Sequence, residues 1–239
     1  KTTTGYFTGG DGTLDGDSIF TASLTTDTHT KHTADKPSKY FFNINHKDPA
    51  TDSNSETQFA VTFGHYAGSG SDTYGDSTNN PNTLKGETEA IYNQLAHTLI
   101  HENEASGGFK IRADGERDDY VFALVGRRER FKDRLNKKAW TLALSGSNTA
   151  GTFSSKTFTD DSKTTPATAT PGGPRYNICE GSLGVCSVAV SSKNYGWFYP
   201  ESGIMVFSGD TLSSSFAGHS DGLNMTASLN ATVGLKAAN

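Results

Sequence analysis

The chain has 239 residues, a net charge of −5, 33% hydrophobic and 10% aromatic residues, and a mean hydropathy of −0.55. The aromatic content excludes wholesale disorder, because disordered chains lack the apolar area that offsets the entropy lost on folding. The negative charge provides no overall field that attracts nucleic acid, and the apolar runs are far shorter than the ~20 residues of a membrane-spanning helix, so we expect neither nucleic-acid binding nor a membrane span.

The dominant local pattern is the alternation of β-branched or aromatic residues with polar ones, bounded by Gly, Asn, Asp or Pro. This pattern is typical of short β-strands. The segments that show it are 18–24, 39–45, 57–63, 108–112, 119–125, 139–145, 174–179, 193–199, 203–207 and 223–235. Many short strands with few helices predict a mainly β fold, with antiparallel sheets in a sandwich or jelly-roll arrangement.

One amphipathic helix is predicted at about 88–104, inserted between the strands. Ile91, Leu95 and Leu99 recur at i, i+4 and i+8, which places them on one helical face, and Tyr92 and Ala96 widen this stripe. The glycine pair at 107–108 is a suitable stop. We expect this helix to pack across one face of a sheet.

Basic residues gather in and around a second, shorter helical turn predicted at 128–135. They could hold phosphate, but acidic residues precede them and the chain is negative overall. Ion pairs within the protein or contact with an acidic neighbouring subunit are therefore the expected roles. The candidate partner interface consists of Arg127, Arg128, Arg130, Lys132, Arg134, Lys137 and Lys138.

Two segments have the composition of long loops: 68–82, rich in Gly, Ser and Asn, and 162–174, rich in Thr and Pro. The strands after the second loop are too few to close a core of their own, so we predict a single β-rich domain over residues 1–239. The alternation at 223–235 runs almost to the last residue without a terminator. It predicts either a segment of a longer protein or a strand that lies against a neighbouring chain.

Cys179 and Cys186 enclose one short loop, which has a suitable length for a hairpin disulfide. Two cysteines are too few for the disulfide framework of a small secreted domain, and this favours a pair of reduced, partly buried thiols. The sequence leaves open both the bridge and the redox compartment.

The segment from Tyr195 to Phe207 predicts a β-hairpin. Two runs of aromatic and aliphatic residues flank the turn PESG at 200–203, where Pro presets the φ of an early turn position and Gly tolerates a positive φ. Tyr195, Trp197 and Tyr199 alternate along the first strand, as on a platform where sugar rings stack. Aromatic residues at this spacing are more often core residues, and we expect a core here.

Three patterns have a chemical interpretation, and each lacks a required part. Ser220 is the serine of a GxSxG motif, but after Asp221 within the motif no histidine or acidic residue follows to complete an esterase triad. His97 and His101 have the i, i+4 spacing of zinc ligands, but Thr98 stands where a zincin has Glu. The Gly-Asp segment at 9–17 lacks the tandem copies of a calcium-binding β-roll. We predict no catalytic residue, no metal and no cofactor.

Four composite segments remain: KYFFNINH from Lys39, QFAVTFGHYAGSGS from Gln58, GRRERFKDRLNKKAWTLALSG from Gly126 with TDDS at Thr159, and NYGWFYPESGIMVFSGDTL from Asn194. Together they resemble virion structural proteins of large contractile-tailed phages that infect cyanobacteria, which are found among tail and baseplate components. The resemblance covers about 39–212 and includes no functional motif that assigns a role to a residue.

This resemblance implies a non-enzymatic tail or baseplate protein, located in the virion, whose partners are other virion proteins and copies of itself. In such an assembly, symmetric neighbours cover the strand edges and polar loops of each subunit. Two alternatives stay open. A carbohydrate-binding β module of a fibre or adhesin requires Trp197 and Tyr199 to be exposed in a row, and a serine esterase requires a reactive Ser220.

Overall fold

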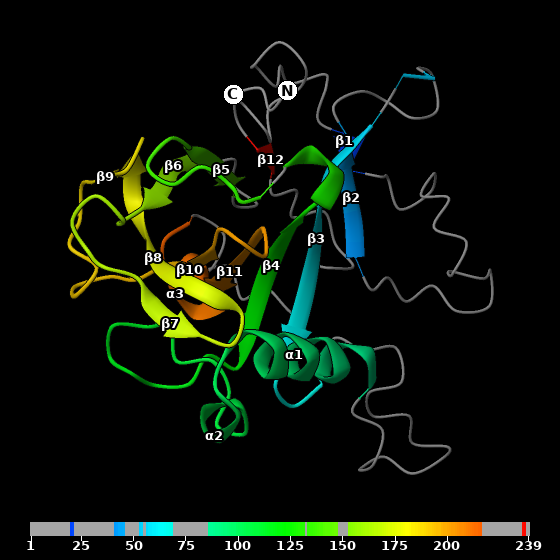
Figure 1. The fold of residues 1–239 in the computed structure, drawn as a ribbon, viewed down its shortest axis with the longest axis vertical. Coiled ribbons are helices and arrows are strands. Elements are labelled where there is room, and N and C mark those ends of the chain that lie inside the picture. Colours follow the sequence, from blue (N-terminus) through cyan, green and yellow to red (C-terminus); the bar gives the residue numbers. More distant parts are fainter. Residues whose placement is uncertain are drawn as a thin grey trace.

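The computed structural model describes residues 20–21, 41–45, 53–54, 56–68, 86–131, 133–147, 153–216 and 236–237 (Figure 1). They form a mainly β fold, an antiparallel and strongly curled half-barrel sheet with one helix of seven or more residues. The predicted fold class is confirmed. The strands form one continuous sheet that curls on itself. In a sandwich two separate sheets face the core, whereas here different parts of the same sheet do so.

In chain order the strands are β1 (Phe20–Thr21), β2 (Phe41–Asn45), β3 (Thr57–His65), β4 (Tyr120–Gly126), β5 (Leu142–Ser147), β6 (Phe153–Asp160), β7 (Thr168–Thr170), β8 (Gly173–Ser182), β9 (Val185–Cys186), β10 (Gly196–Tyr199), β11 (Ile204–Ser208) and β12 (Lys236–Ala237). They pair in the order β1-β2-β3-β4-β11-β10-β8-β6-β5-β12, and β7 and β9 pair with β8 beside this path. All of these pairings are antiparallel.

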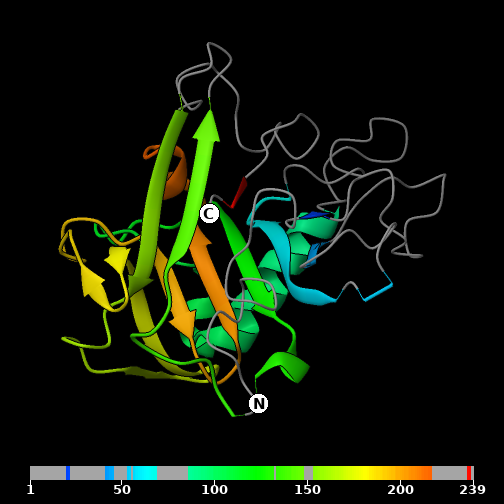
Figure 2. The same ribbon diagram turned by 90° about the horizontal axis from the view of Figure 1, so that it is seen from above.

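The hairpin predicted at 195–207 is confirmed, and it lies at the centre of the sheet (Figure 2). Tyr199 pairs with Ile204, and the Gly203 N–H donates to the Tyr199 carbonyl at 2.9 Å. Gly203 has a φ of +70°, the conformation for which the turn needs glycine. On its outer sides, β10 pairs with β8 and β11 pairs with β4, so the hairpin joins two halves of the sheet.

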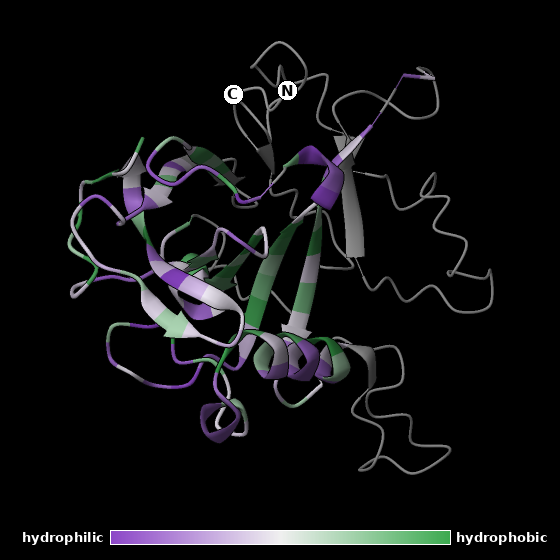
Figure 3. Ribbon diagram, in the orientation of Figure 1, coloured by the Kyte–Doolittle hydropathy of each residue, from purple (hydrophilic) through white to green (hydrophobic). Residues whose placement is uncertain are grey.

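Both faces of the central strands are buried. Successive side chains of β4, β10 and β11 alternate between two apolar clusters, and strands covered on both faces have nearly continuous apolar sequences. In Figure 3, β4 is accordingly hydrophobic along its length. One cluster contains Phe59, Phe63, Phe122, Leu124, Phe158, Phe198, Met205 and Phe207, and the other contains Tyr92, Ala96, Leu99, Phe109, Val121, Ala123, Trp197, Tyr199 and Val206.

The helix predicted at 88–104 is divided into α1 (Gly86–Leu99) and α2 (Glu102–Ala105). His101 between them has an extended backbone, with φ −64° and ψ 145°, and this interrupts the helix. A third short helix, α3 (Gly209–Ser213), directly follows β11. The prediction of one helix crossing the sheet is right in position, but its C-terminal end was placed too late.

The buried face of α1 coincides with part of the predicted stripe. Tyr92, Ala96 and Leu99 have no exposed surface, whereas Leu95 lies only partly buried at the margin of the cluster. A Cβ atom added to Gly64 of β3 would meet the Tyr92 Cα at 2.9 Å. The helix therefore lies directly on β3, and the glycine makes this close approach feasible.

Residues 108–112 form a loop instead of the predicted strand. Phe109 and Ile111 are buried, but the Ile111 N–H donates to the Asp118 carboxylate at 2.8 Å and the Asp118 N–H donates to the Phe109 carbonyl at 2.7 Å. The alternation of apolar and polar residues at 108–112 therefore reflects a loop that buries every second side chain, and not a strand. The predicted strand at 223–235 lies outside the described residues.

Several further strands and one helical segment differ from expectation. β6, β9 and β12 were not predicted, and β7 lies within 162–174, which was predicted as a loop. The helical turn predicted at 128–135 is the 3₁₀ turn η1 (Arg128–Arg130). Apart from Gly68, the loop predicted at 68–82 lies outside the described residues.

Replacing Gly203 with Ala should lower the free energy of unfolding by about 2–4 kcal/mol, because its φ is positive and an added Cβ overlaps the Phe131 ring. Gly115→Ala is the matched control. Its φ is +74°, but an added Cβ would meet nothing within 4 Å, so only the backbone cost of ~1 kcal/mol remains. Urea unfolding measures both, and equal losses would contradict the role of the Phe131 contact.

Candidate functional site

The predicted basic interface lies on the connection between β4 and β5, and part of its charge is paired within the protein. Arg127 forms an ion pair with Glu129 at 2.8 Å, and Arg130 forms one with Glu56, just before β3. The expectation of internal ion pairs is confirmed for these two guanidinium groups. Both glutamates are exposed, so each pair contributes little to stability.

Arg128 is also engaged. It donates to the Glu201 carbonyl at 3.0 Å, and its guanidinium lies 4.8 Å from the centre of the Phe131 ring. These contacts fasten η1 to the turn of the central hairpin. The first half of the basic cluster therefore has a structural role that the sequence alone did not indicate.

The second half of the cluster has basic groups that form no ion pair with a described residue. Arg134 and Lys138 are exposed, whereas the Lys137 ammonium donates to the Tyr176 hydroxyl at 2.8 Å. Lys132 lies outside the described residues. The role of this cluster as a partner interface stays a prediction.

His97 and His101 are both exposed, and His101 contacts the Ala169 carbonyl through Nε2 at 3.3 Å. Within the described ranges, no group of three or more His, Cys, Asp or Glu side chains could hold a metal ion. The spacing of the two histidines is therefore not accompanied by a third metal ligand among the described residues. The Gly-Asp segment at 9–17 and the serine motif around Ser220 lie outside the described residues.

The core position expected for Trp197 and Tyr199 is confirmed, so the exposed row of rings that the carbohydrate-binding alternative requires is absent. Trp197 is 7% exposed and Tyr199 is fully buried, and both belong to the apolar cluster beneath α1. Arg175 covers the Trp197 ring, with its guanidinium carbon 3.9 Å from the ring centre. A sugar could stack on these rings only after part of the core had opened.

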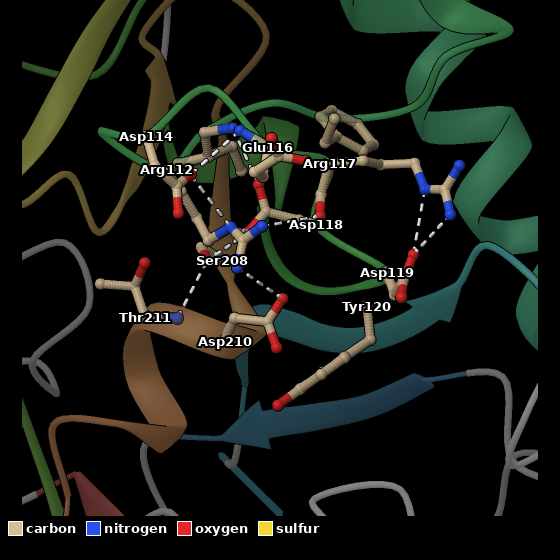
Figure 4. A network of polar contacts seen from close by, with 12 residues as sticks. Arg112, Asp114, Glu116, Arg117, Asp118, Asp119, Tyr120, Ser208, Asp210 and Thr211 are labelled. Atoms are coloured by element: carbon tan, nitrogen blue, oxygen red, sulfur yellow. Dashed lines mark hydrogen bonds and ion pairs between the residues drawn. The ribbon is translucent and has the colours of Figure 1, made fainter.

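A buried polar network around Asp118 connects three segments (Figure 4). One carboxylate oxygen accepts from the Ile111 N–H at 2.8 Å, and the other accepts a short hydrogen bond from the Ser208 hydroxyl. Ser208 is the N-cap of α3, and its oxygen accepts from the Thr211 N–H at 3.0 Å. The network therefore attaches the 109–119 loop to the start of α3.

Charged groups surround this network on its solvent side. Arg112 lies 4.0 Å from Asp118, 3.4 Å from Asp114 and 3.7 Å from Asp210. Burial raises the pKa of Asp118 to about 6, while hydrogen bonds from Ser208 and Ile111 and the charge of Arg112 oppose the shift. Burial also raises the pKa of Asp210.

The arrangement can hold a proton near neutral pH, but it cannot deliver that proton to an external substrate. Asp118 has no exposed surface, and both of its oxygens are engaged with the protein itself. A general acid or base must reach the atom that it protonates within hydrogen-bond distance. Asp118 is therefore a structural clamp.

Cys179 and Cys186 form a disulfide, which corrects the expectation of reduced thiols. The bridge joins β8 to β9, with 5.6 Å between the two Cα atoms. The number of cysteines was a poor guide to their redox state, because one bridge can form across a single hairpin without a larger set of disulfides. The bridge closes a β-hairpin whose turn is formed by Leu183 and Gly184.

We refer to residues 182–185 as the hairpin tip. Its Leu183 and Val185 are 55% and 60% exposed, and they are the exposed large hydrophobic residues of the described part of the chain. Leu183 and Gly184 have φ values of +48° and +73°. Positive φ at both central positions is the type I′ pattern, in which Asn, Asp or Gly is preferred to leucine.

Sequence reasoning missed both Asp118 and the hairpin tip. Asp118 is one carboxylate in an acidic stretch, and its partner Ser208 lies 90 positions away. The tip had one readable signal, because SLGV between two cysteines has the length of a bridged hairpin.

No family model, curated protein or solved structure matches this chain. In the described part of the chain, no helix combines the length and the apolar character needed to cross a membrane. The resemblance to phage virion proteins stays a prediction.

Stability should depend on pH through Asp118. Its folded pKa of about 6 exceeds the ordinary value of 3.8, so the folded state binds the proton more tightly and loses up to ~3 kcal/mol of stability as the pH rises between these values. Asp118→Asn should remove this dependence. The control is Asp119→Asn, whose side chain is 56% exposed. Urea unfolding across this pH range measures all three proteins, and identical pH profiles for the wild type and Asp118→Asn would contradict the clamp.

Removing the disulfide with the double variant Cys179→Ala, Cys186→Ala should lower the free energy of unfolding by about 2 kcal/mol, since the bridge closes a short loop. The measurement is urea unfolding with and without dithiothreitol. Reductant should destabilise the wild type and leave the double variant unchanged. A wild type that is insensitive to reductant in the unfolding transition would show that the bridge adds no stability.

Proposed function

We propose that this chain is a non-enzymatic structural component of a phage virion, in the tail or baseplate, that acts through contacts with other virion proteins and with copies of itself. The resemblance of the segments at 39–46, 58–71, 126–146 and 194–212 supports the virion assignment. Its mode of action is supported by the open sheet, and this observation carries the proposal.

A half-barrel has two edges, whereas a closed barrel has none. The strand path ends at β1 and β12. β1 pairs only with Ile44 and Asn45 of β2, and β12 pairs only with Leu144 and Ser145 of β5. Among the described strands, the rest of these two outer edges has no partner, and a strand from a neighbouring chain can pair with such an edge.

The matching experiment is mass spectrometry of purified particles of the phage that encodes this chain. The chain should be present in intact particles at a fixed ratio to other tail proteins, and it should resist removal by a high-salt wash. Recovery from the infected-cell lysate, with none in the particles, would contradict the proposal.

A labelling experiment tests the non-enzymatic part. Wild-type protein and a Ser220→Ala variant are incubated with a fluorophosphonate probe. We expect no difference in labelling, because the GxSxG motif lacks a later acid and histidine. Labelling that disappears in Ser220→Ala would instead support the esterase alternative.

A further inference from the structure

Leu183 is unfavourable at its position for two independent reasons. A leucine at φ +48° has its Cβ close to the following carbonyl, a strain that Asn or Gly largely avoids. Its side chain is also 55% exposed, so the isolated protein gains little from its apolar surface. An observed backbone outlier of this kind, on an exposed apolar residue, indicates a contact outside the chain.

The hairpin tip is held rigidly in this conformation. The Leu183 N–H donates to the Thr141 hydroxyl at 3.1 Å, and the Gly184 N–H donates to the Thr159 hydroxyl at 2.7 Å. The Lys163 ammonium donates to the Leu183 carbonyl at 2.7 Å, and the disulfide closes the base of the hairpin. A surface fixed in advance loses little conformational entropy on binding.

Positive charge flanks the apolar tip. Lys163 is exposed beside Leu183, and Lys138 is exposed next to Gly184, whose added Cβ would meet the Lys138 Cα at 2.7 Å. The chain as a whole is negative, at −5. The tip therefore combines exposed apolar side chains with positive charge on a chain that is negative overall.

An exposed acidic surface lies elsewhere on the same molecule. It consists of Glu102 and Glu104 of α2, which are exposed and form no ion pair with a described residue. In Figure 1, α2 and β9 are at different ends of the fold. The hairpin tip and the acidic surface of one copy therefore cannot contact each other.

We infer that the hairpin tip docks onto the acidic surface of a second copy of this chain, with Leu183 and Val185 as apolar anchors and Lys138 and Lys163 opposite the carboxylates. Apolar anchors surrounded by complementary charge are typical of protein interfaces. Such a contact joins unlike surfaces, so it continues from copy to copy in a ring or filament. This assignment rests on the proposed function, in which copies of the chain are neighbours.

The first test is sedimentation velocity on a concentration series up to ~1 mM. The wild type should associate reversibly, and Leu183→Asn should weaken association about tenfold or more. The same variant should raise the melting temperature of dilute protein by ~2–4 °C, because Asn tolerates the positive φ. Leu183→Met is the matched control and should retain association. A wild type that stays monomeric, or a Leu183→Asn variant that associates normally, overturns the inference.

A mixing test identifies the second surface. The variant Glu102→Lys, Glu104→Lys should not self-associate, and neither should Leu183→Asn. Mixed together, they should form a heterodimer that does not grow, because one intact tip then meets one intact acidic surface. No heterodimer, from variants of a wild type that does associate, overturns the assignment of the acidic surface.

Two outcomes separate this inference from the virion assignment. A monomeric wild type that is nevertheless found in particles at a fixed ratio overturns the second-copy contact and leaves the proposed function standing. If the chain associates through its tip but is missing from particles, the second-copy contact stands and the proposed function is overturned. Flotation of a monomeric wild type with phosphatidylserine–phosphatidylcholine vesicles, lost in Leu183→Asn, overturns the inference in favour of a lipid surface.

Discussion

Insertion of the β10–β11 hairpin between β4 and β8 is the interaction on which the rest of the structure depends. β11 pairs with β4 from Ile204↔Val125 to Ser208↔Val121, and β10 pairs with β8, so each half of the sheet is incomplete without the hairpin. The hairpin also contributes to both cores. Phe198 lies in the cluster on one face and Trp197 in the cluster beneath α1. Opening this hairpin would expose both clusters at once, which makes the fold cooperative.

The parts of the fold that could be predicted are those with a local signal. The central hairpin combines turn chemistry with two apolar runs, and α1 has a clear periodicity. β6 and β7 could not be found, because their Ser- and Thr-rich segments are strands only through pairing with neighbours, β6 with β5 and β8 and β7 with β8. The opposite error occurred at 108–112, where Phe109 and Ile111 alternate like a strand but are buried in a loop beneath α1.

The functional features were harder to predict, since each depends on contacts between distant residues. Burial of Asp118 requires Ser208, and rigidity of the hairpin tip requires Thr141 and Thr159. The two features differ in what they leave exposed. The Asp118 network is closed within the protein, whereas the tip directs its apolar side chains to solvent. The hairpin tip and the open sheet edges are therefore the parts of the described structure that remain available for contact with other chains.

The central claim is that a rigid sheet presents the hairpin tip and its open edges to neighbouring chains. Hydrogen–deuterium exchange on dilute and on assembled protein tests this claim most directly. Amides of β10 and β11 should exchange slowly in both samples, because they are bonded on both sides within the sheet. The peptides that cover the hairpin tip and the outer edges of β2 and β5 should become protected only on assembly. Protection that appears elsewhere, with the tip and both edges unchanged, would contradict the account.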